Sequence, residues 1–211
     1  MFRSDALHAI TAHDLAILHS LDIATIVDLR SSREISSTGR GRLESSSIKF
    51  IEVDALSEHS SPIPSRADEV PLHDVYWRYL TTRPERYVFA LETLADPGTY
   101  PVIVNCFFGK DRTGILVALV LACLDVPRDV IIDDYALSAT RMTYIVERLQ
   151  EDPVYRETLA RTPSSRLDAS PDTMMNFLDR LEEHFGGARS WALHAGVSSA
   201  QLESMRSALL Q

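Results

Sequence analysis

The stretch Pro101-Val-Ile-Val-Asn-Cys-Phe-Phe-Gly-Lys-Asp-Arg-Thr-Gly114 joins a short apolar segment to a glycine-containing loop, and a longer apolar run follows it. Pro101–Val104 is typical of a strand that is buried at the centre of a sheet. The run Ile115–Leu124 has the composition of a buried helix. This order of strand, tight loop and helix predicts an α/β domain.

Strand and helix signals also alternate on the N-terminal side of this stretch. Thr11 begins a capping box that predicts a helix ending near Ser20. Two β-branched runs, Ile23–Leu29 and Ile48–Val53, predict strands. The polar residues 30–47 between these runs are rich in serine, glycine and arginine, and they are predicted to form a loop.

Prolines punctuate the chain on both sides of the central stretch. Residues 57–71 contain three prolines and are predicted to be irregular. Val75–Leu94 has apolar residues at helical spacing with an interruption near Pro84, which predicts two helices or one broken helix. Residues 153–170 are polar and contain prolines, so they are predicted to connect the helices on either side.

The C-terminal half shows helix signals alone. Helical patterns cover residues 127–135 and 142–150. A further helix is predicted between Ser170 and Gly186, and a last one after the capping box that begins at Ser198. We therefore expect an α/β fold with a small central, mostly parallel sheet flanked by helices and a helical C-terminal half.

The composition is that of one soluble globular domain, which we expect to span residues 1–211. Hydrophobic residues make up 45% of the chain and charged residues 24%, values that argue against disorder and fibrous structure. The formal net charge of −9 argues against binding to nucleic acid. An anionic substrate would need a local positive site.

Cysteine usage and apolar segments suggest a cytoplasmic protein without an integral membrane segment. Two cysteines, Cys106 and Cys123, are too few for a disulfide framework, and the second lies in an apolar run typical of buried cysteines. The first residues do not resemble a signal peptide, although unconventional secretion would leave no signal there. Ile115–Leu124 is too short to span a bilayer. Nothing in the sequence sets an oligomeric state.

The loop between the predicted buried strand and helix has a Cys-x5-Arg spacing, from Cys106 to Arg112. A short loop that enters a helix directs backbone N–H groups inward and forms a cradle for an anion. The positive end of the helix favours the thiolate form of a cysteine, which is the nucleophilic form. Arg112 offers a planar fork of donors that matches phosphate oxygens. These features suit the transfer of a phosphoryl group to sulfur.

The loop Cys106–Gly114 resembles the signature loop of the protein tyrosine phosphatase superfamily. Its full string is similar to a bacterial tyrosine and lipid phosphatase family that includes secreted mycobacterial and listerial enzymes. The resemblance spans nearly the whole chain, since four further segments share it: Phe2–Leu7, Ile26–Arg30 followed by Glu34, Asp134–Ser138 and Ala195–Glu203.

The resemblance implies a role for each residue of the loop. Cys106 would be the nucleophile, Arg112 the phosphate ligand, and Asp111 the general acid that protonates the leaving oxygen. Lys110 would add positive charge that favours phosphoinositide head groups. The residues expected to contact the substrate are Phe107, Phe108, Gly109, Lys110, Thr113 and Gly114.

Ordinary tyrosine phosphatases bring their acid on a separate loop, so a second assignment of the acid stays open. Asp74 is the second candidate for the general acid, and Asp54 and Asp96 are weaker candidates. By analogy with the family, helices within residues 142–185 would form a lid over the site. The implied partner is a phosphoprotein or phosphoinositide, and no cofactor or metal is expected, because the histidines show no ligand spacing.

One departure from the superfamily precedes the nucleophile, where Asn105 replaces the usual histidine. Asparagine can still donate and accept hydrogen bonds, but it has no charge to stabilise a thiolate. We therefore expect weakened activity. Asp28 and Arg30, at the end of a predicted strand, are interpreted as a structural ion pair that supports the loop rather than as substrate contacts.

Two alternatives to an enzyme of this type remain at this stage. Asn105 is compatible with a catalytically dead module that binds phospholigands. A sulfur-transfer domain would also use a cysteine in a loop, although nothing specific favours it. The aromatic residues Tyr76, Trp77 and Tyr79 are predicted to pack under the sheet rather than to line the mouth of the site.

Overall fold

The computed structural model describes residues 1–56, 70–151, 153–160 and 162–210. Within them, four strands form one sheet in the order β1-β4-β2-β3, and every pairing is parallel. The predicted irregular residues 57–71 lie almost wholly outside the described part of the chain. The strands are β1 (Phe2–Ser4), β2 (Thr25–Asp28), β3 (Lys49–Glu52) and β4 (Val102–Asn105).

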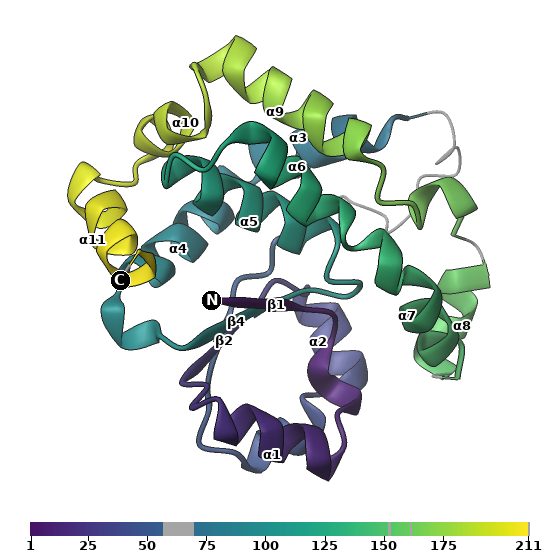
Figure 1. Cartoon of the computed structure of the whole chain (residues 1–211). Helices are drawn as coiled ribbons and strands as arrows, with labels where there is room; N and C mark the ends of the chain where they lie inside the picture. Colours follow the sequence, from purple (N-terminus) through teal and green to yellow (C-terminus); the bar gives the residue numbers. More distant parts are fainter. Residues whose placement is uncertain (57–69, 152, 161, 211) are drawn as a thin grey trace.

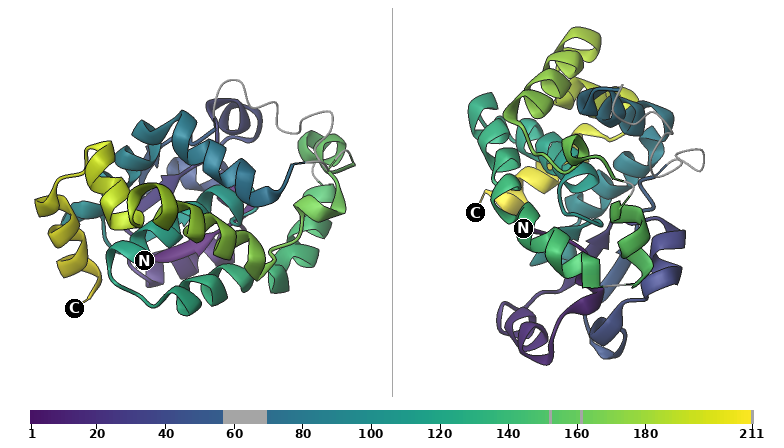
Figure 2. Two further views of the ribbon diagram at one scale, coloured as in Figure 1. Left: turned by 90° about the horizontal axis from the view of Figure 1, so that it is seen from above. Right: turned by 90° about the vertical axis from the view of Figure 1, so that its right-hand side faces the viewer.

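Alternate residues of the central strands face opposite sides of the sheet. Ile26 and Ile103 are paired in register and belong to a small apolar cluster, while Val27 and Val104 belong to the main core. Figure 1 shows α1 (Ala12–Ser20) on the side of the small cluster, with most of the helices on the other side. The side view in Figure 2 shows the same two layers, so the predicted α/β fold is confirmed.

The main core forms around α5 (Asp111–Cys123), which directly follows the loop of interest. Ten residues of this helix are buried, from Arg112 to Cys123, because other helices surround it on the sheet. Those helices are α3 (Leu72–Thr82), α4 (Pro84–Ala95), α6 (Arg128–Ala136), α9 (Pro171–Phe185), α10 (Ala188–Ala195) and α11 (Ser199–Leu209). None of the helices in the described ranges is long and apolar enough to cross a membrane.

Capping chemistry explains several helix starts. The predicted boxes at Thr11 and Ser198 both form, and the break at Pro84 separates α3 from α4 as expected. The prediction of a loop over residues 30–47 was partly wrong, because this segment contains α2 (Ser32–Thr38) and η2 (Gly41–Ser45). A capping box between Ser31 and Glu34 begins α2 and was readable in the sequence.

Four further elements of the described residues, β1, α8, η5 and α10, were not predicted. β1 has only three residues, which is too short to show a strand pattern. The connection 153–170 contains α8 (Pro153–Ala160) and η5 (Ser164–Arg166), because proline at the first helical position starts a helix as readily as it ends one. α10 is a short helix bounded by glycines.

Candidate active site

The loop that begins with Cys106 leaves β4 at the carboxyl edge of the sheet, where ligand sites of open α/β sheets form. Cys106 is almost fully buried, and Arg112 is the second residue of α5. The first turn of α5 therefore begins directly after the loop, with its unpaired amides at this edge. Sequence spacing alone predicted this placement of the cysteine and the arginine.

The N-terminal strand supports the loop from behind. The amide of Ala6 donates to the carbonyl of Phe107 at 3.0 Å. Gly109 has φ +65°, and a Cβ added to it would lie 2.5 Å from the carbonyl oxygen of Ser4. A side chain at position 109 would thus meet both an unfavourable backbone conformation and a backbone clash.

Arg3 joins this strand to the loop and to α6. Its Nη2 donates to the carbonyl of Gly109 at 2.9 Å and to Ser138 Oγ at 3.1 Å, and its Nη1 pairs with Asp134 Oδ2 at 2.7 Å. Two sequence segments that resemble the phosphatase family, at the N-terminus and at residues 134–138, therefore meet at one guanidinium behind the loop.

The guanidinium of Arg112 is held by Glu34 of α2. Arg112 Nη1 and Nη2 donate to the two carboxylate oxygens at 2.7 and 2.9 Å, and Nη1 also donates to the carbonyl of Leu29 at 3.0 Å. Burial by itself lowers the pKa of Arg112, but the adjacent charge of Glu34 raises it well above the ordinary value. The arginine is thereby fixed in a charged state before any ligand binds.

The charge of Glu34 links stability to acid pH. Burial raises its pKa, but Arg112 and the hydrogen bonds from Ser31 outweigh burial and bring it from 4.5 to about 2. Because the folded pKa is the lower one, the stabilisation is fully present above about pH 4.5 and is lost as the pH falls toward about 2. We expect Glu34→Gln to be less stable at neutral pH and to lose less stability on acidification. Urea denaturation midpoints of both proteins across this range measure the difference, and parallel curves would contradict the assignment.

The carboxyl group of Asp111 lies at the first position of α5 and is partly exposed. The hydroxyl of Tyr76 donates to its Oδ1 at 2.7 Å. The ammonium group of Lys110 lies 3.4 Å from the same oxygen. Both contacts hold the carboxyl next to the loop, where a leaving group would need its proton.

The side chain of Lys110 was expected to favour phosphoinositide head groups, but it points into the protein. Its side chain is fully buried, and its Nζ donates to the carbonyls of Arg166 and Asp168 at 2.5 and 2.8 Å. In this conformation the lysine fastens the loop to the segment between η5 and α9.

Asn105, Asp28 and Arg30 form a fully buried polar group behind Cys106. Asn105 Nδ2 donates to Asp28 Oδ1 at 3.2 Å, and Arg30 Nη2 pairs with Asp28 Oδ2 at 2.7 Å. Asp28 and Arg30 balance each other's charge, so Asn105 adds a neutral link between the ends of β2 and β4. The pair lies where a structural role was predicted, away from solvent.

The remaining predicted ligands lie around the same loop. Phe107 is buried and packs edge-on against the half-buried Phe108, with ring centroids 4.5 Å apart. Thr113 Oγ1 is buried and has no hydrogen-bond partner among the described residues. Gly114 faces Tyr135, whose ring leaves no room for a Cβ.

The reserve acids all have structural partners. Asp74 forms an ion pair with Arg180 of α9. Asp54 accepts a hydrogen bond from Ser32 at 2.9 Å, and Asp96 caps η4 (Pro97–Thr99) through the amide of Gly98. Asp111 belongs to the loop itself, so geometry favours it as the acid.

Two helices beyond α6 cover Phe107 at the carboxyl edge of the sheet. α7 (Ala139–Glu151) and α8 contribute Met142, Ile145, Leu149, Tyr155 and Leu159 to one apolar cluster with Phe107. Figure 1 shows both helices at the end of the molecule where the strands end, separate from the main helical layer. α9, by contrast, packs in the main core through Met174, Phe177, Leu178 and Leu181.

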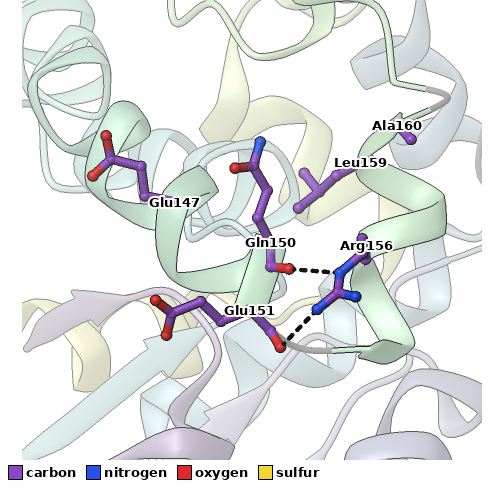
Figure 3. Close-up of a pocket in the computed structure, with 6 residues that line it drawn as sticks. All are labelled: Glu147, Gln150, Glu151, Arg156, Leu159 and Ala160. Carbon is purple, nitrogen blue, oxygen red and sulfur yellow. Dashed lines mark hydrogen bonds between the residues drawn. The ribbon is translucent and has the colours of Figure 1, made fainter.

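A surface hollow of about 780 Å³ lies between α7 and α8, and Figure 3 shows the residues that line it. It is lined by Glu147, Gln150, Glu151, Arg156, Leu159 and Ala160. The guanidinium of Arg156 donates to the last carbonyls of α7 there, which is a common way to end a helix. None of the predicted site residues lines this hollow.

Sequence reasoning missed two side chains of the site. Glu34 holds Arg112; the sequence pointed to it through the family resemblance and its capping-box position, but assigned it no role in the site. Tyr79 is half-buried beside the loop, where loss of solvent raises its pKa to about 12 and the positive charge of Arg112 opposes this shift. Tyr76, predicted to pack, does so and also binds Asp111.

Comparison with known proteins agrees with this geometry. The chain is 28% identical to the triple specificity protein phosphatase PtpB of Mycobacterium tuberculosis over 259 aligned positions, which cover 100% of this chain and 90% of the relative. It is 22% identical to a tyrosine-protein phosphatase of Nostoc commune, over 97% of this chain and 72% of the relative. The sequence model of the tyrosine phosphatase family matches residues 1–211. The chain therefore belongs to the tyrosine phosphatase family.

Proposed function

We propose that this phosphatase hydrolyses phosphotyrosine through a phosphocysteine intermediate on Cys106. The observation that supports this most is the pairing of a buried cysteine with a fixed, charged Arg112 at the start of α5. In the first step the thiolate attacks phosphorus, an S–P bond forms, and the P–O bond to tyrosine breaks. Asp111 gives its proton to the departing phenolate oxygen.

The second step returns the enzyme to its starting state. Water attacks the phosphorus, Asp111 takes the proton of the water, and the P–S bond breaks to release inorganic phosphate and the thiolate. Arg112 and the amides at the start of α5 bind the equatorial oxygens in both steps, because charge stays on those oxygens throughout. The bridge to Glu34 keeps the arginine fork oriented between turnovers.

The proposed substrates also include phosphoserine, phosphothreonine and phosphoinositides. The name of the Mycobacterium tuberculosis relative, a triple specificity phosphatase, supports a broad range. A direct contact between Lys110 and a lipid head group would require its ammonium to leave the carbonyls of Arg166 and Asp168. We therefore place phosphotyrosine first among these substrates.

We also propose that α7 and α8 act as the lid expected within residues 142–185. Their apolar residues pack on Phe107, and this contact would have to open to admit a phosphotyrosine side chain. α9 lies in the main core and stays outside the proposed lid.

Hydrolysis of 4-nitrophenyl phosphate with EDTA present tests the proposed function. We expect slow turnover that EDTA leaves unchanged, and a severalfold gain in Asn105→His, because a cationic imidazole beside Cys106 would favour the thiolate. A wild-type protein that binds phosphotyrosine without turnover, together with an active Asn105→His variant, would instead establish the phospholigand-binding alternative. Inactivity of both proteins would overturn the proposed function.

A further inference from the structure

A chain of two buried tyrosines leads to the carboxyl group of Asp111. The hydroxyl of Tyr76 lies 2.7 Å from Asp111 Oδ1, and the hydroxyl of Tyr135 lies 2.7 Å from that of Tyr76. The tyrosines come from α3 and α6, are 0% and 1% exposed, and meet edge to face. Asp111 is thus the outer end of a hydrogen-bonded chain that reaches into the core.

The direction of the chain follows from counting protons. A carboxylate accepts only, so the single hydroxyl proton of Tyr76 is donated to Asp111. The hydroxyl of Tyr135 must then donate to the oxygen of Tyr76. Burial raises the pKa of both phenols far above the ordinary value, so both remain neutral donors. Each hydrogen bond in such a chain polarises its neighbour and thereby strengthens it.

The contact with Tyr76 is compatible with both proton states of the acid. Tyr76 and the ammonium of Lys110 both face Oδ1, and no described residue donates a hydrogen bond to Oδ2. If Oδ2 is protonated, Oδ1 becomes a carbonyl oxygen and still accepts from Tyr76. The side chain therefore need not rotate between donating a proton and receiving one.

We propose that Tyr76, supported by Tyr135, is the positioning residue that reserves Oδ2 of Asp111 for proton transfer. This inference rests on the proposed function, with Asp111 as the acid. Tyr76 touches neither the phosphoryl group nor the leaving oxygen, and it acts by holding the carboxyl of Asp111. Asp111 is partly exposed, and a carboxyl held through Oδ1 would keep Oδ2 in a fixed orientation.

Close packing maintains the chain. A Cβ at Gly114 would lie 2.9 Å from Cδ2 of Tyr135, so this ring can approach α5 only because position 114 is glycine. Gly114, expected from the sequence to contact substrate, thus also admits the inner tyrosine.

Leaving-group dependence tests the inference, because protonation matters most for a poor leaving group. Tyr76→Phe should lower kcat/KM, which reports the step that expels the leaving group, about tenfold on phenyl phosphate, the effect of losing one hydrogen bond, and less than about twofold on 4-nitrophenyl phosphate. Tyr135→Phe should show the same selectivity with a smaller loss. Tyr100→Phe is the matched control, since it removes a hydroxyl that donates to the carbonyl of Leu94, on the helix before β4. Its ratio of kcat/KM values for the two substrates should equal that of the wild type.

A double-mutant cycle separates positioning from a general loss of structure. In an Asp111→Asn background, Tyr76→Phe should cause no further loss on phenyl phosphate, because the proton donor is already gone. Equal losses on both substrates, or a loss that persists in the Asp111→Asn background, would overturn the role of Tyr76 while leaving Asp111 as the acid. If Asp111→Asn itself shows no selective loss, the assignment of the acid fails and the inference with it.

Discussion

Replacement of Cys106 by serine is expected to abolish turnover and to leave phosphate binding largely intact. A serine hydroxyl is a far weaker nucleophile than a thiolate at neutral pH. The loop amides and Arg112 do not depend on the sulfur, so the anion cradle should persist. Turnover of 4-nitrophenyl phosphate and calorimetric binding of a phosphotyrosine peptide measure the two effects.

Cys123→Ser provides the matched control for this experiment. Cys123 lies at the far end of α5, where burial raises its thiol pKa to about 11, so it has no nucleophilic role in the proposal. Its serine variant should keep wild-type kcat at a temperature where it is folded. Turnover that survives in Cys106→Ser would contradict the nucleophile assignment.

The second large effect is expected from Arg112→Lys, with a loss on the order of a thousandfold in kcat/KM. Lysine keeps the positive charge but has no planar fork, so it cannot bridge both oxygens of Glu34 and present donors to a phosphate. The loss should appear mainly in kcat, because the oxygens of the transition state need the fork most.

Arg128→Lys is a suitable control for the arginine experiment. Arg128 pairs with Asp179 at 2.5 Å on the exposed surface, on helices α6 and α9. Its replacement removes the same chemical group from an exposed position outside the loop, and kcat and KM should be unchanged. If kcat/KM of Arg112→Lys stays within tenfold of the wild-type value, a positive charge alone is sufficient for catalysis and the planar fork is not needed.

The fold was largely predictable because its strongest signals are local. Pro101–Val104 is apolar throughout, and α5 is the apolar run that follows the loop. The sequence did not mark β1, whose three residues gain their structure by pairing with β4. α8 was also missed, because its proline was interpreted as a break when it is the first residue of the helix.

The site was predictable where its residues are adjacent in the chain and not where packing assembles it. Cys106 and Arg112 share one loop and helix start, so their spacing indicated them, and the family resemblance added Asp111 from the same loop. Glu34 is 78 residues from Arg112 and Tyr76 is 35 residues from Asp111, and such distances leave no local pattern. For Lys110, the sequence shows a positive charge but not where the side chain points. Its ammonium is turned toward the carbonyls of residues 166 and 168, which lie 56 and 58 positions away in the chain.

The central claim is a covalent phosphoryl group on Cys106, and detection of that intermediate tests it most directly. The wild-type enzyme would be denatured rapidly during turnover of a phosphotyrosine peptide, digested at a pH that preserves thiophosphate esters, and mapped by mass spectrometry. We predict the mass of one phosphoryl group on the peptide that contains Cys106, and no such adduct in Cys106→Ser. A phosphoryl group on any other residue, or an adduct that persists in Cys106→Ser, would contradict the proposed mechanism.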